Sequence, residues 1–325
     1  MKAVAILMDQ AGPPEVLQLR EVDVPAPGPG EVQVAQSACG VNFLDIYQRS
    51  GSYSMPMPMG AGNEAAGRVV AVGAGVEGFA EGDRVAYQGG SPGAYASLRN
   101  LAAHRLVPLP DGVSEEEAAA VMLKGMTVEY LLERCVSLKP GDMAMMYAAA
   151  GGVGLLAGQW AKATGIKLIG VASGPEKCAL AREAGYFAVI DRKAEDIVAR
   201  VKDLTGGAGL PAVFDSVGKD TYEVTLDCLG PRGVFVSFGA SSGPPPPVVA
   251  AELQKRGSLY FTRPTLATYC GTPELYAASA KRLMEMLGSG ALKPQIGRRR
   301  PLAEAADAHR DLAAGITTGA TILLP

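Results

Sequence analysis

A turn rich in small residues, at 149 to 154, is the clearest candidate for binding chemistry. Its spacing is Ala149-x-Gly151-x-x-Gly154, preceded by the strand-like MAMMYAA and followed by the helix-like LLAGQWAKATG. A strand that turns sharply into a helix presents free backbone N–H groups and the positive end of the helix dipole. Both attract a phosphate, and small residues let that phosphate come close. We therefore expect a dinucleotide pyrophosphate here; the alternative is a tight strand-to-helix turn with nothing bound.

The elements after residue 142 alternate in the order that such a turn requires. Strand-like stretches are separated by helix-like ones at 153–163, 176–184, 194–204 and 220–228; the strands are MAMMYAA, KLIGVA, FAVI, PAVFDS and GVFVSFG. This alternation predicts a parallel sheet with helices on both faces, with the small-residue turn after its first strand. A further strand, GSLYFT at 257–262, is expected at the edge of that sheet.

The remainder of the chain is organised differently. Residues 1 to about 110 contain short strand-like stretches broken by Gly and Pro, which indicates an irregular all-β unit. Ser114 followed by Glu117 predicts the capped start of a helix that passes between domains. Two more helices are expected at 273–288 and 302–314, followed by a final apolar stretch, TILLP.

Composition bounds the class of protein. A chain of 325 residues is long enough for two domains. A net charge of -3 offers no broad basic field for nucleic acid or an anionic membrane, and the cluster Arg298 to Arg300 is interpreted as a solvated loop. Five scattered cysteines without a CxxC pair indicate a reduced intracellular protein with buried thiols. We find no signal-like or membrane-spanning stretch and expect a soluble cytoplasmic protein.

The stretch GNEAAGRVVAVGAGVEGFAEGDRVAY at 62–87 resembles the pattern of the medium-chain dehydrogenase/reductase superfamily. The chain also contains, in order, GVNFLDIYQRSGSY, LKGMTVEYLL, AAAGGVGLLAGQWAKATG, FDSVG and GSLYFTRP. With these it resembles the zinc-independent quinone oxidoreductase (zeta-crystallin-like) branch from end to end. The resemblance implies an α/β fold, with a GroES-like irregular β catalytic domain (1–124 and 266–325) and a Rossmann doubly wound parallel sheet (125–265). It also implies NADPH binding, hydride transfer to a quinone, and a homodimer.

The same resemblance bears on metal binding. Zinc-dependent members carry a cysteine at the position of Asn42, a histidine at that of Asn63 and a cysteine near Lys124. Amides are poor zinc ligands, and no cluster of four cysteines offers a structural zinc site. The two histidines, His104 and His309, lie on other segments and are expected to be structural or solvated. We expect no metal, and Glu64 could instead hold a polar network together.

The resemblance also identifies residues around the cleft for the acceptor: Asn42, Asp45, Tyr47, Tyr53, Lys124 and Thr127. Without a Lewis acid a quinone is the easier acceptor, because it already accepts hydride readily. Tyr47 or Tyr53 could donate a hydrogen bond to the developing oxyanion or stack on the ring; alternatively each is an ordinary core or loop aromatic. The loop SMPMPMG lines the entrance or is a plain surface loop.

On the cofactor side, the resemblance assigns Gly152 and Val153 to the pyrophosphate. It assigns four residues to the nicotinamide half: Ser216, Phe238, Gly239 and Ser241. Residues 215–218, DSVG, could equally be a simple turn at a strand end.

The cofactor's 2′-phosphate has its own candidate residues. NAD-specific folds place a carboxylate after the second strand, whereas here that strand ends in the neutral Ala172 and Ser173. Lys177 and Arg192 could converge on the 2′-phosphate of NADPH, or could be solvated surface charges. Most members of the branch carry a tyrosine near the position of Arg192, so the chain departs from the family pattern there.

Two other functions stay open at this point. An NADPH-dependent enone or alkenal double-bond reductase needs the same flat slot together with a proton donor. A non-catalytic protein could also use NADPH only as a stabilising ligand.

Overall fold

In the computed structural model, which describes residues 1–325, the alternating elements after residue 142 form the predicted parallel sheet. It has six strands in the order β11-β10-β9-β12-β13-β14, and all of its ladders are parallel. The strands are β9 (Met143–Tyr147), β10 (Lys167–Ala172), β11 (Ala188–Asp191), β12 (Leu210–Asp215), β13 (Leu229–Ser237) and β14 (Tyr260–Thr262). The last of them lies at the sheet edge, as predicted, although it is shorter than 257–262.

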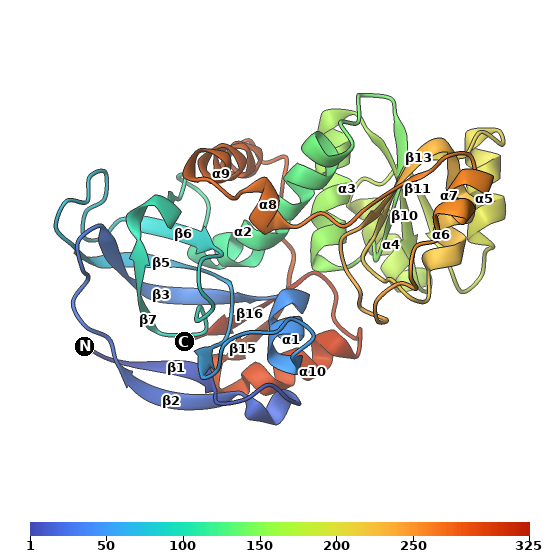
Figure 1. The fold of residues 1–325 in the computed structure, drawn as a ribbon. Helices are drawn as coiled ribbons and strands as arrows, with labels where there is room; N and C mark the ends of the chain where they lie inside the picture. The colour runs from blue at the N-terminus through green and yellow to red at the C-terminus, as the bar shows by residue number, and fades with distance from the viewer. The chain divides into compact units, whose positions relative to one another are not determined.

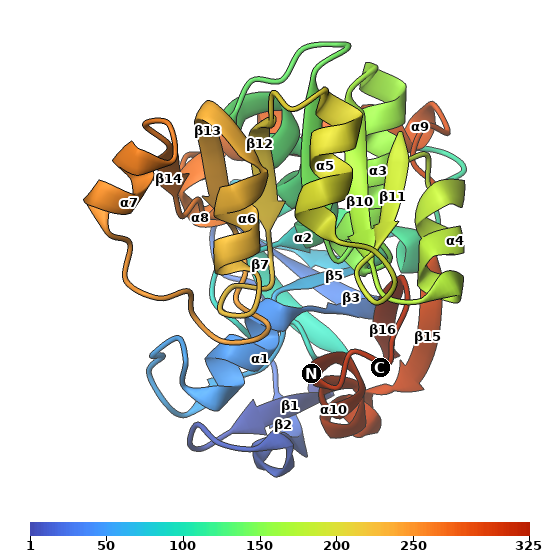
Figure 2. The same cartoon turned by 90° about the vertical axis from the view of Figure 1, so that its right-hand side faces the viewer.

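Helices connect these strands. α3 packs beside α4, and α5 lies beside α6 against the strands (Figure 2). Right-handed crossovers put the two pairs on opposite faces of a doubly wound sheet. The helices are α3 (Gly152–Thr164), α4 (Pro175–Glu183), α5 (Ile197–Thr205), α6 (Tyr222–Cys228), α7 (Ala250–Lys255) and α8 (Leu266–Tyr269). Their apolar faces and the strands enclose a core that contains Met145, Ile169, Val213 and Phe235.

The sheet belongs to one of two compact units of the chain. This unit, unit 2, comprises Thr127–Gly271 and Ala291–Lys293; unit 1 comprises Met1–Met126, Thr272–Gly290 and Pro294–Pro325.

Unit 1 is built mainly from antiparallel strands (Figure 1). Its larger sheet has the order β15-β16-β3-β5-β6-β8, with β7 also paired to β3, and a smaller sheet has the order β2-β1-β4. The strands are β1 (Lys2–Met8), β2 (Gln18–Asp23), β3 (Glu31–Val41), β4 (Met59–Gly60), β5 (Glu64–Val72), β6 (Arg84–Gln88), β7 (Leu98–Ala102), β8 (Val107–Pro108), β15 (Ile296–Pro301) and β16 (Ala320–Leu324). Inward-facing residues including Ile6, Val34, Tyr87 and Leu101 form its core.

The remaining helices are α1 (Phe43–Ser50), α2 (Glu115–Glu129), α9 (Pro273–Gly288) and α10 (Ala305–Ala313). The predicted cap of α2 is present, because Glu117 N–H donates to Ser114 Oγ at 3.2 Å and Ser114 N–H donates to Glu117 Oε2 at 2.9 Å. The helix predicted at 273–288 is confirmed. The one predicted at 302–314 begins instead with a short 3-10 turn, Leu302–Glu304.

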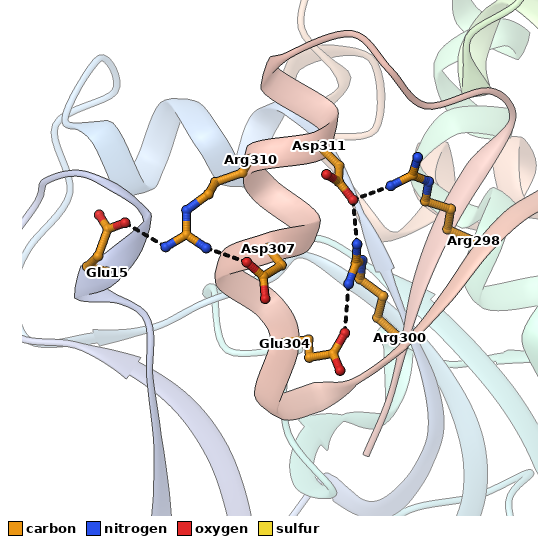
Figure 3. A network of polar contacts seen from close by, with 7 residues as sticks. All are labelled: Glu15, Arg298, Arg300, Glu304, Asp307, Arg310 and Asp311. Carbon is orange, nitrogen blue, oxygen red and sulfur yellow. Dashed lines mark hydrogen bonds and ion pairs between the residues drawn. The ribbon is translucent and has the colours of Figure 1, made fainter.

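The interpretation of Arg298 to Arg300 as a solvated loop was wrong. These arginines lie in β15, which pairs in parallel with β16 at the edge of the larger sheet. Arg298 and Arg300 both bind the Asp311 carboxylate on α10, and Arg300 also binds Glu304 (Figure 3). Opposite charges further along the chain therefore hold this basic segment in a strand.

Four of the five cysteines are buried, as expected, whereas Cys135 is only half-buried. No helix combines the length and the apolar character needed to cross a bilayer.

Candidate functional site

The first candidate site lies where β3 passes into α1. Asn42 is the N-cap of α1, and its backbone N–H donates to Asp45 Oδ2 at 2.7 Å. This contact satisfies one of the free donors at the helix start and fixes the Asp45 side chain. Gly51 ends the helix with a φ of 82°, a conformation that glycine adopts without strain.

Glu64, the first residue of β5, is fully buried and accepts three hydrogen bonds. The donors are Asn42 Nδ2 at 2.8 Å, Leu123 N–H at 2.6 Å and Lys124 Nζ at 2.6 Å. Lys124 is itself only 5% exposed, so the two opposite charges are buried together. A Cβ on the facing Gly40 would lie 2.2 Å from Glu64 Oε1, which makes a glycine necessary there. The expected polar network around Glu64 is therefore present.

A second carboxyl network is centred on Asp45. Asn63 Nδ2 donates to Asp45 Oδ1 at 2.6 Å and to Gln48 Oε1 at 2.6 Å. Tyr95 Oη donates to Asp45 Oδ2 at 2.8 Å. Burial raises the pKa of Asp45 to about 6, although these hydrogen bonds act in the opposite direction. No motif in the sequence indicated Gln48 or Tyr95 as partners.

His309 completes this network from α10. It is fully buried, and its Nε2 lies 3.1 Å from Tyr95 Oη. Burial lowers the pKa of His309 to about 3, so the imidazole is neutral. Since Tyr95 gives its only proton to Asp45, His309 donates to Tyr95 through Nε2–H. The histidine is thus structural rather than solvated.

The donor set of this region does not fit zinc. No three His, Cys, Asp or Glu side chains gather where they could hold a metal ion. The Asn63 amide nitrogen is engaged by two oxygens, and the Lys124 ammonium is paired with Glu64. Neither group offers a lone pair to a metal.

Aromatic rings lie beside the polar networks. The Tyr47 ring is 6.1 Å from that of Phe43 and 5.2 Å from that of Tyr53, both in tilted arrangements. Tyr53 is 40% exposed and therefore not a core residue. In the neighbouring methionine-rich loop, Met57 and Met59 pack against the core of unit 1.

Thr127 follows Lys124 by one turn of α2 and is buried. Residues three apart share one face of a helix, so these two side chains emerge on the same side of α2. Thr127 nevertheless belongs to unit 2, whereas the other candidate acceptor residues belong to unit 1.

In unit 2, the small-residue turn joins β9 to α3. The helix starts at Gly152 with Gly151 as N-cap, and buried Ala149 precedes them. A Cβ on Gly154 would lie 2.3 Å from Ala148 O, so a larger residue would displace the turn. The N–H groups of the first turn, including that of Val153, have no acceptor within the helix. The turn therefore fits a phosphate in size, charge and donors.

The ends of β10 and β11 meet at a second part of the candidate cofactor site. Arg192 Nε donates to Ser173 Oγ at 2.5 Å. Asp191 Oδ1 ties the two segments together by accepting from Gly174 N–H at 2.8 Å and Lys193 N–H at 3.0 Å. Ser173 and Arg192 are thereby brought together, and Lys177 stands in the first turn of α4.

The ends of β12 and β13 form the third part. Phe238 N–H donates to Asp215 O at 2.8 Å, and Ser241 N–H donates to Ser216 O at 3.1 Å. A Cβ on Gly239 would lie 2.6 Å from Ser216 O. The structure thus brings together the four residues assigned to the nicotinamide half. Asp215 is part of the sequence motif FDSVG, but the residues that it contacts lie too far along the chain to be inferred from that motif.

Comparisons with known proteins agree with this architecture. Residues 28–111 match the family described as alcohol dehydrogenase GroES-like domain, and residues 152–280 match the zinc-binding dehydrogenase family. The chain is 52% identical over 315 residues to a quinone oxidoreductase of Pseudomonas aeruginosa, covering 97% of each chain. It is 38% identical over 332 residues to a 2-haloacrylate reductase of a Burkholderia species, covering 99% of each. The crystal structure of Escherichia coli quinone oxidoreductase complexed with NADPH superposes with a TM-score of 0.96 at 44% identity, covering 99% of this chain and 100% of that one.

Proposed function

This chain belongs to the quinone oxidoreductase branch of the medium-chain dehydrogenase/reductase superfamily, and we propose that it transfers a hydride from NADPH to a quinone without a bound metal ion. The observation that carries the proposal is the cluster in which Glu64 binds Lys124 and Asn42. It puts an amide at the position of one metal ligand of zinc-dependent members, and an ammonium near the position of another. A quinone is a strong hydride acceptor, so its reduction does not need a Lewis acid.

Bound NADPH supplies the hydride, and the chain's residues bind and orient it. The N–H groups of Gly152 and Val153, with the positive end of α3, bind the pyrophosphate. The hydroxyl of Ser173 and the cations of Lys177 and Arg192 bind the 2′-phosphate. Ser216, Phe238, Gly239 and Ser241 would hold the nicotinamide half.

The acceptor is bound by the group of Phe43, Tyr47 and Tyr53. Aromatic faces at this spacing suit a flat conjugated ring, and the two hydroxyls can donate to an oxygen that gains negative charge. Asn42, Asp45 and Lys124 line the polar side of the acceptor site in unit 1.

A second candidate activity is reduction of a conjugated carbon–carbon double bond. It is favoured by the similarity, over nearly the whole chain, to a 2-haloacrylate reductase. Such an acceptor takes the hydride at carbon and needs a proton at the neighbouring carbon, for which a tyrosine hydroxyl is the candidate donor.

Steady-state NADPH oxidation with a matched panel of quinones and enones tests these activities. We expect turnover with quinones, no loss of rate after prolonged chelation, and well under one zinc per chain by metal analysis. Faster turnover of enones would favour the second activity. Stoichiometric zinc would refute the metal-free mechanism, and tight NADPH binding without any turnover would indicate a non-catalytic protein.

We also propose a homodimer that forms through β14, and a cytoplasmic location. The free cysteines fit a reducing compartment. The net charge of -3 gives no support for a nucleic-acid partner.

A further inference from the structure

We propose that Asp215 is a positioning residue for the nicotinamide half of NADPH, acting through the backbone of the two segments that follow β12 and β13. This inference rests on the proposed cofactor. It assigns a role to a carboxylate that has no place in the mechanism above.

Asp215 is the last residue of β12 and is fully buried. Its Oδ1 accepts from Val217 N–H at 2.7 Å and from Gly218 N–H at 3.0 Å. Its Oδ2 accepts from Thr221 Oγ1 at 2.7 Å and from Thr225 Oγ1 at 3.1 Å. Both oxygens of this buried carboxyl are therefore used, one for the turn and one for α6.

The second oxygen attaches the turn to rigid elements. Thr221 is the N-cap of α6 and Thr225 lies one turn later, so both hydroxyls emerge on one side of the helix. Thr225 Oγ1 also lies 3.3 Å from Tyr147 Oη, at the end of the central strand β9, and since Thr225 gives its only proton to Asp215 it accepts from the tyrosine hydroxyl. The turn 215–218 is thus fixed to a helix and to the middle of the sheet.

The turn 215–218 also holds the segment that follows β13. Asp215 O, Ser216 O and Val217 O accept from Phe238 N–H at 2.8 Å, Ser241 N–H at 3.1 Å and Ser242 N–H at 2.9 Å. Gly239 passes so close to Ser216 that no side chain fits between them. A shift of the turn therefore moves both segments that are proposed to contact the nicotinamide.

Asp191 provides a matched control. It too ends a parallel strand, and its Oδ1 accepts two backbone N–H groups. Those N–H groups belong to the segments that carry Ser173 and Arg192, on the adenine side of the proposed cofactor. Loss of either aspartate should therefore affect a different half of the ligand.

The test measures the dissociation constants of NADPH and of adenosine 2′,5′-bisphosphate by titration calorimetry. Asp215→Asn keeps the size of the side chain but replaces one acceptor oxygen by an N–H donor. We expect this variant to weaken NADPH binding roughly tenfold and to change the dissociation constant of the bisphosphate by no more than about twofold. Asp191→Asn should weaken both ligands. A purely structural role of Asp215 would not separate the two constants.

Thr221→Val, which removes one donor to Asp215 Oδ2, should weaken NADPH binding in the same selective way. Thr221→Ser keeps the hydroxyl and should restore the affinity for NADPH. This pair decides the question if Asp215→Asn does not fold. Unchanged NADPH affinity, or equal loss of both ligands, in Asp215→Asn and Thr221→Val would overturn the inference. Wild-type protein that binds no NADPH would instead overturn the proposed function, and the inference with it.

Discussion

At the residue scale, Asp45 combines burial with hydrogen bonding. Its pKa of about 6 lies above the value near 3.9 of an unfolded chain. The folded protein therefore binds this proton more tightly, and the stabilisation present at low pH is lost as the pH rises through about 6. Folded His309 stays neutral in this window, since burial lowers its pKa to about 3, and its own contribution to stability therefore rises with pH, opposite to that of Asp45.

Comparison of wild type with Asp45→Asn isolates the effect of the Asp45 proton on the free energy of unfolding. The free energy of unfolding of wild type, minus that of the variant, should fall by about 2 to 3 kcal/mol between pH 4 and pH 7. Urea unfolding at a series of pH values measures this difference. A difference that stays constant, or that rises with pH, would contradict the raised pKa.

Lys177 and Arg192 should determine the preference between NADPH and NADH. Each charge-assisted hydrogen bond to the 2′-phosphate contributes roughly 1.5 to 3 kcal/mol, less where it is exposed, so wild type should prefer NADPH to NADH by about tenfold to several hundredfold. Lys177→Ala and Arg192→Ala should each weaken NADPH and barely change NADH. Titration of both cofactors at two salt concentrations tests this, because salt screens the charges and should reduce the preference for NADPH over NADH. Lys193→Ala, a change at the neighbouring lysine, is the control.

At the element scale, β15 is an edge strand whose outer side has no partner strand. Arg298 and Arg300 attach it to α10 by sharing Asp311 (Figure 3). Burial tends to raise the pKa of Asp311, but the two arginines outweigh it and the pKa is lowered. The stabilisation that the Asp311 carboxylate gives to β15 is therefore present at neutral pH and is lost as the pH falls through the lowered pKa.

Asp311→Asn should accordingly loosen β15 without unfolding the unit. We expect amide hydrogen exchange in β15 to accelerate roughly tenfold, while exchange in β5 stays unchanged. Arg299→Gln is the control from the same strand, because its ion pair with Glu116 is partly exposed to solvent on both sides and contributes little. Equal acceleration in both variants would show that Asp311 is not the attachment.

Elements with local sequence patterns could be predicted, and those that depend on distant partners could not. The parallel sheet follows from the alternation of strands and helices after residue 142. Helix α1 was missed within a stretch interpreted as strands, although Asn42, Asp45 and Gly51 are cap signals at its ends. The link from Asp45 through Tyr95 to His309 spans more than 200 residues, and no sequence spacing encodes it.

At the scale of the whole molecule, the edge strand β14 determines the expected assembly. It pairs only with β13, and Tyr260 on it is 61% exposed. An uncovered edge invites pairing with another chain, and a twofold axis through β14 would join two copies into one continuous sheet. Self-pairing about such an axis is antiparallel and brings the same side chains of the two copies close together.

Tyr260→Glu should therefore convert a dimer into a monomer, because two like charges would face each other across the axis. Sedimentation velocity at micromolar concentration measures this directly. Phe187→Glu is a matched control, since Phe187 is 51% exposed and lies next to β11, at the opposite edge of the same sheet. It should leave the dimer intact. A monomeric wild type, or dissociation caused by the control as well, would exclude β14 as the interface.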